Sequence, residues 1–409
     1  MQICTVNKTN IIMKKMKKMK KLSVSILATV AILLSSCSLD NDDENQGIIP
    51  GTEVTSQNLA GNLTTDLRLT SGIAHNLIGA LLVKDGATLT IDAGTRINAL
   101  AGGTDVYILV EKGGKIIADG TADNPIVFTS NATNPQPGDW GGIIVNGKAP
   151  LSRQAGSDSN SAAEVNAAIL YGGAVSEDNS GILNYVKIEY TGARIDDEAE
   201  HNGLTLNAVG AGTIISNIAI LNGDDDGIEF FGGTVNATNI LVVNAKDDMF
   251  DFTQGYVGTC TNLYGVRENG YTAVTSDPRG IEADGNLDGN TPTDIDQSQF
   301  TIDKITIINN ASGVDMSDGI KVRRGATATI TNAYLSLGAG ATYSDLVDLT
   351  DGKGDGTDAI SITGNANTAN GLDITDIKNT TSGGASVSIT AATTGGADSS
   401  VFAWSGYSF

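Results

Sequence analysis

Apolar and polar residues alternate in short runs that recur along the middle of the chain. A run such as Ile218–Leu221 returns 22 residues later as Ile240–Val243, each time followed by Asn. Five other runs, each built around one apolar strand, start 24, 22, 31 and 39 residues apart: Gly203–Leu206, Gly227–Phe230, Met249–Phe252, Gly280–Ala283 and Gly319–Val322. A repeat near 22 residues with short strands and Gly or Asn turns predicts an all-β solenoid, a right-handed parallel β-helix.

The same alternation predicts the extent of the solenoid. Residues 82–95 alternate between glycine turns and the next coil repeats the pattern, so the helix proper is expected to begin near Leu77. Residues 58–76 are then expected to form a short N-terminal cap over the open sheet end. The apolar and aromatic segment Val401–Phe409 is expected to cap the C-terminal end. We therefore predict a single β-helix domain over residues 58–409, caps included.

The N-terminus has the features of an export signal. Lysines after Met13 are followed by the apolar run Leu22–Leu34, which is too short to span a bilayer as a mature helix. The run leads into Leu-Ser-Ser-Cys at Cys37, which resembles a bacterial lipobox, in which the cysteine is diacylated and becomes the first residue. We interpret residues 1–36 as a lipoprotein signal peptide with its true start at Met13. An ordinary signal peptide with a cysteine at this place by chance is the alternative.

An acidic segment follows Cys37. Residues 38–44 contain four acids, and a polar stretch continues to about Gln57. One interpretation of residues 37–57 is a flexible, solvated tether. The other is that the acids resemble the signal with which lipoproteins of Bacteroidetes reach the outer face of the outer membrane. On that resemblance we expect a lipid-anchored protein of the outer membrane that faces the cell exterior.

Composition and charge narrow the class of ligand. Fifty glycines fit the many tight turns of a solenoid. The 47 acidic and 25 basic residues give a formal net charge of −22, which disfavours nucleic acid and anionic membranes and favours cations or neutral ligands. Loss of Cys4 with the signal and lipidation of Cys37 leave Cys260 as a single thiol. Stability must therefore come from the stacked core rather than from disulfides.

Outward-facing side chains of the repeated strand form a candidate ligand-binding wall. Side chains alternate between the two faces of a strand, so the residues between the apolar ones point outward. They form two columns on successive coils: Thr205, Glu229, Asp251, Glu282 and Lys321, and then Asn207, Phe231, Thr253, Asp284 and Arg323. Three neighbouring carboxylates roughly 4.8 Å apart repel one another unless their pKa values rise or a cation binds. Lys321 and Arg323 are expected to close this wall with positive charge.

Aspartates also occupy the turns that enter this strand on two adjacent coils, at Asp224–Asp226 and Asp247–Asp248. One interpretation is an ordinary turn, because Asp side chains accept hydrogen bonds from nearby backbone N–H groups. The other is that Asp226 and Asp248 join the wall in a calcium or saccharide site.

One insertion between coils contains a candidate calcium loop. Residues 284–289 fit the first six positions of such a loop, Asp-x-Asn-x-Asp-Gly, whereas Ile295 stands where the Glu of position twelve is expected. The candidate ligands for Ca²⁺ are Asp284, Asn286, Asp288, Asp294 and Asp296. The alternative interpretation is a solvated acidic loop that binds no cation.

Several motifs together resemble a known family. They are Gly120–Ser130, Gly138–Ile143, Gly147–Pro150, Asp225–Gly233 and Arg279–Asp284. They are similar to motifs of β-helix lipoproteins and secreted proteins of Bacteroidetes and related bacteria. The resemblance covers roughly residues 75–330. It implies an outer-membrane protein associated with a receptor, and it supplies no catalytic residues.

Two functional hypotheses follow. The first is a surface lipoprotein that acts as a structural or ligand-binding partner, for a glycan or a cation, and is associated with a TonB-dependent transporter. The alternative is a Ca²⁺-dependent polysaccharide lyase or glycoside hydrolase on a pectate-lyase-like β-helix, with Lys321 or Arg323 removing the proton. The paired aspartates resemble those of polygalacturonases, but the Gly-His-Gly motif of that family is absent, and His201 is interpreted as a turn residue. Trp140 is either a buried corner aromatic or an exposed sugar platform.

Overall fold

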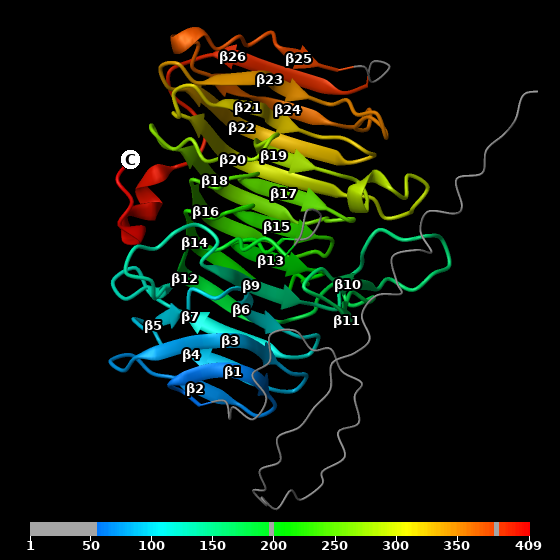
Figure 1. The fold of residues 1–409 in the computed structure, drawn as a ribbon. Coiled ribbons are helices and arrows are strands. Elements are labelled where there is room, and N and C mark those ends of the chain that lie inside the picture. Colours follow the sequence, from blue (N-terminus) through cyan, green and yellow to red (C-terminus); the bar gives the residue numbers. More distant parts are fainter. Residues whose placement is uncertain (1–54, 196–199, 380–383) are drawn as a thin grey trace, which may run out of the picture. The chain divides into compact units, whose positions relative to one another are not determined.

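The computed structural model describes residues 55–195, 200–379 and 384–409. Almost all of their strands pair in parallel with the strands one coil before and one coil after, so that the coils stack into a parallel β-helix (Figure 1). The fold class predicted from the sequence repeat is therefore confirmed. Within the described residues, no helix is both long and apolar enough to cross a bilayer.

The predicted repeat forms a row of strands that we call the first row. Parallel pairing aligns Leu204 with Ile228, and Phe250 with both Ile228 and Ile281, as the alternation predicts. In chain order the strands of the first row are β1 (Asn58–Leu63), β3 (His75–Val83), β6 (Gly103–Val110), β9 (Trp140–Asn146), β13 (Leu204–Asn207), β15 (Ile228–Phe231), β17 (Phe250–Thr253), β19 (Arg279–Ala283), β21 (Asp315–Lys321), β23 (Thr342–Asp348) and β25 (Ile377–Lys378).

A second row completes the coils. Its strands are β2 (Leu67–Leu69), β4 (Thr88–Ile91), β7 (Lys115–Asp119), β12 (Gly181–Glu189), β14 (Ile214–Leu221), β16 (Ala237–Val243), β18 (Thr259–Arg267), β20 (Gln299–Asn309), β22 (Thr327–Leu337), β24 (Ser361–Ala366) and β26 (Ser386–Ala391). Two further strands, β5 (Arg96–Ala99) and β8 (Ile126–Ser130), link β3 to the second half of β12.

Asparagines bend the longer strands of the second row. Asn217, Asn239 and Asn262 lie in the middle of β14, β16 and β18 with φ values of 51°, 58° and 62°. Asn adopts this left-handed conformation more readily than most residues. The side chain of Asn239 donates to that of Asn217 at 2.9 Å, and that of Asn262 donates to Asn239 at 3.0 Å. The stacked amides thus stabilise the corner that each coil needs.

The core lies between the rows and is aliphatic with one aromatic stack. Phe250 is fully buried, in accord with the predicted register. The ring of Phe252 stacks on that of Phe230, with centroids 5.1 Å apart, and on that of Phe300, with centroids 4.5 Å apart. Inward residues one coil apart thus contact each other directly.

Insertions stand beside the outward face of the first row. Two short strands, β10 (Ser161–Ala163) and β11 (Asn166–Tyr171), form an antiparallel hairpin. The Tyr171 hydroxyl at its base donates to Gln254 Oε1 at 2.6 Å. The insertion after β19 contains a 3₁₀ turn, η2 (Leu287–Gly289). Another turn, η3 (Ala369–Gly371), follows β24 and contacts β22 of the second row.

The two ends of the solenoid differ from the expectation. Residues 58–76, expected as an N-terminal cap, lie at that end as strands, because β1 and β2 pair in parallel with β3 and β4. The expectation that Val401–Phe409 caps the C-terminal end is wrong. This segment, with the 3₁₀ helix η4 (Ser399–Ser405), folds back against β14 and β16 (Figure 1). Phe402 is buried there against outward apolar residues such as Leu241 and Val243, and removal of this apolar surface from water favours the observed position.

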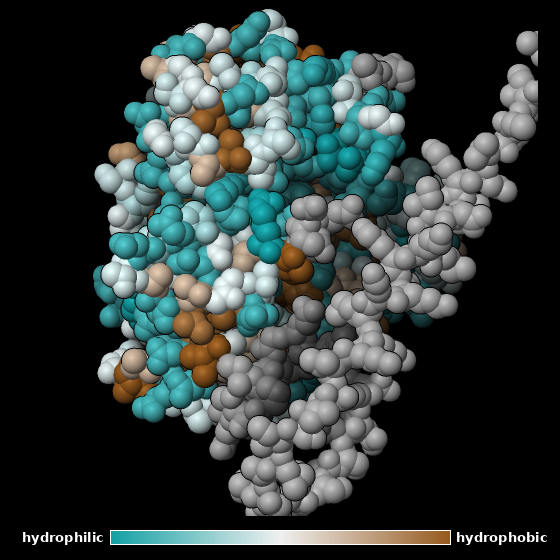
Figure 2. Space-filling model, viewed as in Figure 1, coloured by the Kyte–Doolittle hydropathy of each residue, from teal (hydrophilic) through white to brown (hydrophobic). Residues whose placement is uncertain are grey.

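The surface agrees with the composition. The face in Figure 2 is mostly polar, with apolar residues in small separate groups. Among the described residues, the exposed large apolar side chains are Ile73, Leu100, Leu170, Val175, Ile195, Ile214, Val257, Ile295 and Phe409.

Candidate functional site

Two columns of side chains run along the outward face of the first row. Parallel pairing aligns Glu229 with Asp251 and Asp251 with Glu282, so the predicted strand column is confirmed. An entry column lies three residues earlier in each coil, where the chain enters the strand, and Arg279 is aligned there with Asp318. The strand column is Thr205, Glu229, Asp251, Glu282, Lys321 and Asp348, and the entry column is Asn202, Asp226, Asp248, Arg279, Asp318 and Asp345.

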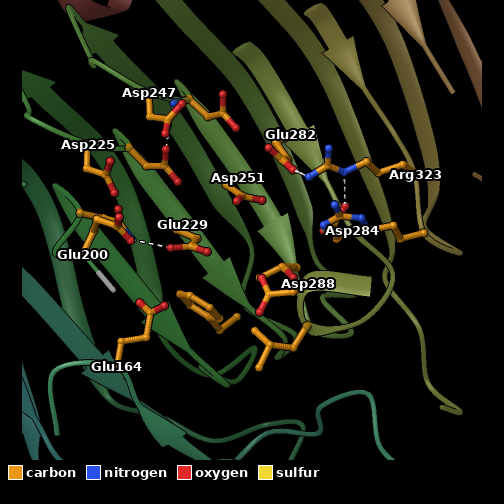
Figure 3. A pocket seen from close by; sticks show the side chains of 17 residues that line it. Glu164, Glu200, Asp225, Glu229, Asp247, Asp251, Glu282, Asp284, Asp288 and Arg323 are labelled. Carbon is orange, nitrogen blue, oxygen red and sulfur yellow. Dashed lines mark hydrogen bonds and ion pairs between the residues drawn. The ribbon is translucent and has the colours of Figure 1, made fainter. Parts of the chain in front are cut away.

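The acidic part of these columns lies in a cavity of about 210 Å³, which we call the acidic groove (Figure 3). Insertions build its sides: Glu164 comes from the β10–β11 hairpin, Glu200 from the segment before β13, and Asp288 from η2. Glu229 is therefore only 9% exposed. The groove is lined by Glu164, Glu200, Asn202, Asp225, Asp226, Glu229, Phe231, Asp247, Asp248, Asp251, Thr253, Glu282, Asp284, Leu287, Asp288, Arg323 and Arg324.

Eleven carboxylates and two arginines line this small volume, which gives a charge of −9 if every group is ionised. Burial raises the pKa of Asp226, Glu229 and Asp251 well above the usual values, because it disfavours the charged form. Neighbouring carboxylates raise these pKa values further. The carboxylates of the groove therefore repel one another, and bound protons or metal cations can reduce this repulsion.

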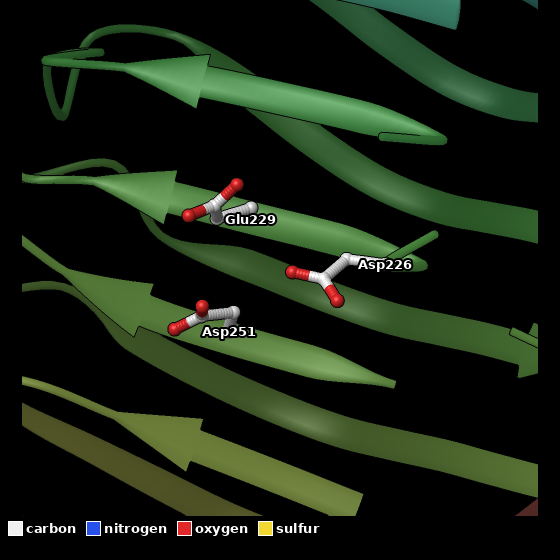
Figure 4. A group of neighbouring side chains, drawn as sticks. All are labelled: Asp226, Glu229 and Asp251. Carbon is white, nitrogen blue, oxygen red and sulfur yellow. The ribbon is translucent and has the colours of Figure 1, made fainter. Parts of the chain in front are cut away.

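Asp226, Glu229 and Asp251 form what we call the carboxylate triad (Figure 4). One oxygen of each lies within 4.8 Å of the others. In the described part of the chain, no lysine or arginine forms an ion pair with any of the three. Asn202 Nδ2 donates to Glu229 at 2.5 Å, while Asn202 Oδ1 and Asp251 Oδ1 are buried without a hydrogen-bond partner. Oxygens grouped in this way are the ligands that Ca²⁺ prefers.

Farther along the same columns, the protein supplies the positive charge itself. Arg279 replaces an acid in the entry column and donates to Glu282 at 2.6 Å and to Asp318 at 3.0 Å. Burial alone would lower the pKa of Arg279, but Asp248 and the other carboxylates around it raise that pKa. Within the same two columns, the carboxylates around Arg279 are thus neutralised by side chains of the protein, whereas the carboxylates of the triad are not.

Lys321 and Arg323, which were expected to close the wall together, lie in different places. Arg323 lies in the groove, where it pairs with Glu282 and, at 2.8 Å, with Asp284. Lys321 instead donates to Asp348 at 2.5 Å and does not line the groove. Lys321 therefore follows Glu282 in the strand column, as predicted, but lies outside the groove that it was expected to close. The next coil places a carboxylate directly opposite Lys321 in register, which the spacing of the earlier coils did not reveal.

The candidate ligands of the calcium loop expected over residues 284–296 do not meet at one point. Asp284 is held by Arg323 and, at 2.6 Å, by Arg324, while Asp296 pairs with Arg153 at 3.1 Å. Arginines thus supply the charge that a cation would otherwise supply. In the described chain no three carboxylates of this segment meet within 4.8 Å. Of the five candidate ligands, Asp284 and Asp288 line the acidic groove, whereas Asn286, Asp294 and Asp296 do not.

The turn aspartates bind backbone N–H groups of the next coil. Asp226 Oδ1 accepts from the backbone N–H of Asp248 at 2.8 Å, and Asp248 Oδ1 accepts from that of Arg279 at 2.5 Å. These hydrogen bonds join successive coils and are not local contacts within one turn. Yet Asp226 and Asp248 also line the acidic groove, and Asp226 belongs to the triad.

Several groove residues were not predicted from the sequence. Asn202 carries a usable signal, since every member of the entry column stands three residues before a member of the strand column. Glu164 and Glu200 carry none, because they come from insertions outside the repeat. Arg324 is adjacent to the predicted Arg323 and escaped notice because it lies outside the alternation.

Trp140, His201 and Cys260 are buried residues with structural roles. Trp140 is fully buried and its Nε1–H donates to the Glu189 carbonyl at 2.8 Å, which confirms the buried corner. Burial lowers the pKa of His201 to about 4, so its imidazole is neutral at pH 7. Burial raises the pKa of the Cys260 thiol to about 12, so this thiol is unreactive.

Comparison with known proteins supports the fold. The family model of the pectate-lyase-like β-helix domain matches residues 61–405. Among solved structures, the chain is similar to the enzymatically active domain of tailspike protein 2 of bacteriophage CBA120, with 13% identity and a TM-score of 0.39. The similarity covers 78% of this chain and 48% of that one, so this chain spans about half of its length. No curated protein matches the sequence at a significant level.

Proposed function

This chain belongs to the pectate-lyase-like β-helix domain family, and we propose that its acidic groove binds Ca²⁺, which in turn holds a glycan. The observation that carries the proposal is a contrast in charge neutralisation within the strand and entry columns. Arginine and lysine neutralise the carboxylates from Arg279 onward, whereas the carboxylate triad has no such partner among the described residues. Buried carboxylates without a partner are costly, and a bound cation offsets that cost.

The charge of the groove favours a neutral glycan over an anionic one. One Ca²⁺ adds two positive charges to a lining of eleven carboxylates and two arginines, so a negative excess remains. The cavity of about 210 Å³ is smaller than the roughly 300–1,000 Å³ of typical ligand pockets. It fits a cation and part of one sugar residue, whose hydroxyl oxygens complete the coordination shell.

Calorimetry with a panel of neutral and uronate-containing oligosaccharides tests this proposal. We expect a component of neutral-glycan binding that is present in Ca²⁺, lost in EDTA and lost in Asp251→Asn. If EDTA removes no component of binding to any glycan in the panel, the proposal is wrong.

A second candidate is the Ca²⁺-dependent lyase, which one observation favours. Arg323 lies in the groove among the carboxylates that would hold Ca²⁺, and burial, together with Arg324 and Arg279, lowers the pKa of its guanidinium to about 10. The test is incubation with polygalacturonate and Ca²⁺. A lyase gives unsaturated products with the parent protein and none with Arg323→Gln, and a parent protein that yields neither unsaturated products nor new reducing ends is not this enzyme.

We also propose that the protein is a lipoprotein on the outer face of the outer membrane and partners a TonB-dependent transporter. This rests on the lipobox-like sequence at Cys37 and the acidic residues after it, which lie outside the described residues. Cys37→Ser should release a soluble or unprocessed species, because no diacylglycerol can be attached without the thiol. Fractionation and detergent partitioning check this result, and a variant that stays in the outer membrane as the parent does contradicts the anchor.

A further inference from the structure

A second and larger cavity, which we call the side cavity, lies beside the turns that follow β15 and β17. Its volume is about 700 Å³, within the roughly 300–1,000 Å³ typical of ligand sites. The strand of the acidic groove and the turn of the side cavity belong to the same coils, since Thr253 lines the groove and Gly255 lines the side cavity.

Backbone hydrogen bonds fix the walls of the side cavity. Ser152 donates to the Gln254 carbonyl at 2.9 Å, and Arg153 exchanges two backbone hydrogen bonds with Ile295, at 3.1 and 2.8 Å. Gly255 lets the walls approach, because a Cβ there would lie 2.3 Å from the Ser152 nitrogen. The site is therefore formed before any ligand binds, which lowers the entropy cost of binding.

The lining of the side cavity is close to neutral, in contrast to the acidic groove. Arg153 and Asp296 form an ion pair at 3.1 Å, which leaves Asp158 as the other charged residue of the lining. Val257 is 44% exposed in this cavity. Ser176 and Gln299 also line it, and within the described chain their side chains are not engaged in hydrogen bonds.

We propose that the side cavity binds a neutral oligosaccharide without the help of a cation. Sugar rings present apolar C–H faces and hydroxyl edges, so Val257 supplies an apolar contact while Ser176, Gln299 and the Arg153–Asp296 pair supply hydrogen bonds to hydroxyl groups. A charged polymer would leave its charge unpaired here. This second site goes beyond the proposed function, which concerns the acidic groove alone.

The test uses the whole domain in EDTA, so that Ca²⁺ in the acidic groove contributes nothing. Neutral hexasaccharides of glucose, xylose, mannose and galactose are titrated by calorimetry. We expect at least one of them to bind. Val257→Trp should weaken its binding at least about tenfold, because the indole occupies the place of the sugar ring beside Val257, and Gln299→Ala should weaken it by a smaller factor that corresponds to one hydrogen bond. Ile214→Trp is the control, because Ile214 is 50% exposed on β14 and does not line the side cavity.

Three results overturn the proposal: no hexasaccharide binds in EDTA, or Val257→Trp and Gln299→Ala both bind like the parent, or Ile214→Trp is as impaired as they are. Circular dichroism reports whether Val257→Trp folds, and Gln299→Ala decides the question if it does not. Asp251→Asn in the acidic groove should leave this binding unchanged, so a failure of the calcium proposal and a failure of this one are distinguishable.

Discussion

Asp251→Asn is expected to abolish the rise in melting temperature that millimolar Ca²⁺ gives the parent protein. A ligand that binds only the folded state stabilises it by mass action, by about 2.7 kcal/mol at 100 times its Kd. Asp251 contributes one carboxylate to the triad and one buried oxygen without a partner, so its removal should cost most of the affinity. In EDTA the same variant should melt at a higher temperature than the parent, because one of the repelling charges is gone.

Asp294→Asn is the matched control for the competing loop. Asp294 belongs to the calcium loop expected from the sequence but does not line the acidic groove. It should keep the full shift with Ca²⁺. A shift that disappears in Asp294→Asn and survives in Asp251→Asn would assign the cation to the loop instead of the triad.

Phe250→Ala is expected to lower the free energy of unfolding by roughly 3–5 kcal/mol, the usual range for deleting a buried aromatic ring. Phe250 is fully buried and aligned in the core with Ile228 and Ile281. Chemical denaturation measures the change. Ile214→Ala is the control, since Ile214 is 50% exposed and should change stability by less than about 0.5 kcal/mol. Similar stability of Phe250→Ala and Ile214→Ala would contradict the register on which the groove is built.

The register of the first row was predictable because one physical rule decides it. Apolar side chains must face the core with a period of two, so the run containing Ile228 and Phe230 fixes the outward direction of Glu229. The same rule held for Asp251 and Glu282 on the next coils. A repeat near one coil length then predicts that these carboxylates lie beside one another.

The burial of those carboxylates was not predictable from the repeat. The groove exists because the β10–β11 hairpin and η2 pack beside β15 and β17, and insertions of this kind carry no periodic pattern. The partners of the charges were hidden for a similar reason. Arg324 reaches Asp284 from a turn 40 residues farther along the chain, and a motif fitted to consecutive residues does not describe such a contact.

The position of the C-terminal segment likewise could not be predicted from the sequence. The aromatic content of Val401–Phe409 predicts a cap on the C-terminal end, whereas the segment lies against β14 and β16. The sequence does not reveal this surface, because the outward apolar residues Leu241 and Val243 of β16 lie far away in the sequence.

The pH dependence of the calcium effect tests the central claim most directly. In EDTA, the triad carboxylates have pKa values raised by burial, so above the unfolded pKa near 4 the folded state binds more protons than the unfolded state, and stability falls as pH rises. Ca²⁺ binds the deprotonated groups, so its stabilising effect grows over the same range. The measurement is the melting temperature in EDTA and in Ca²⁺ at about pH 5 and about pH 8. We predict a small shift with Ca²⁺ at the lower pH and a large one at the higher pH, whereas no shift at either pH would contradict a cation site in the acidic groove.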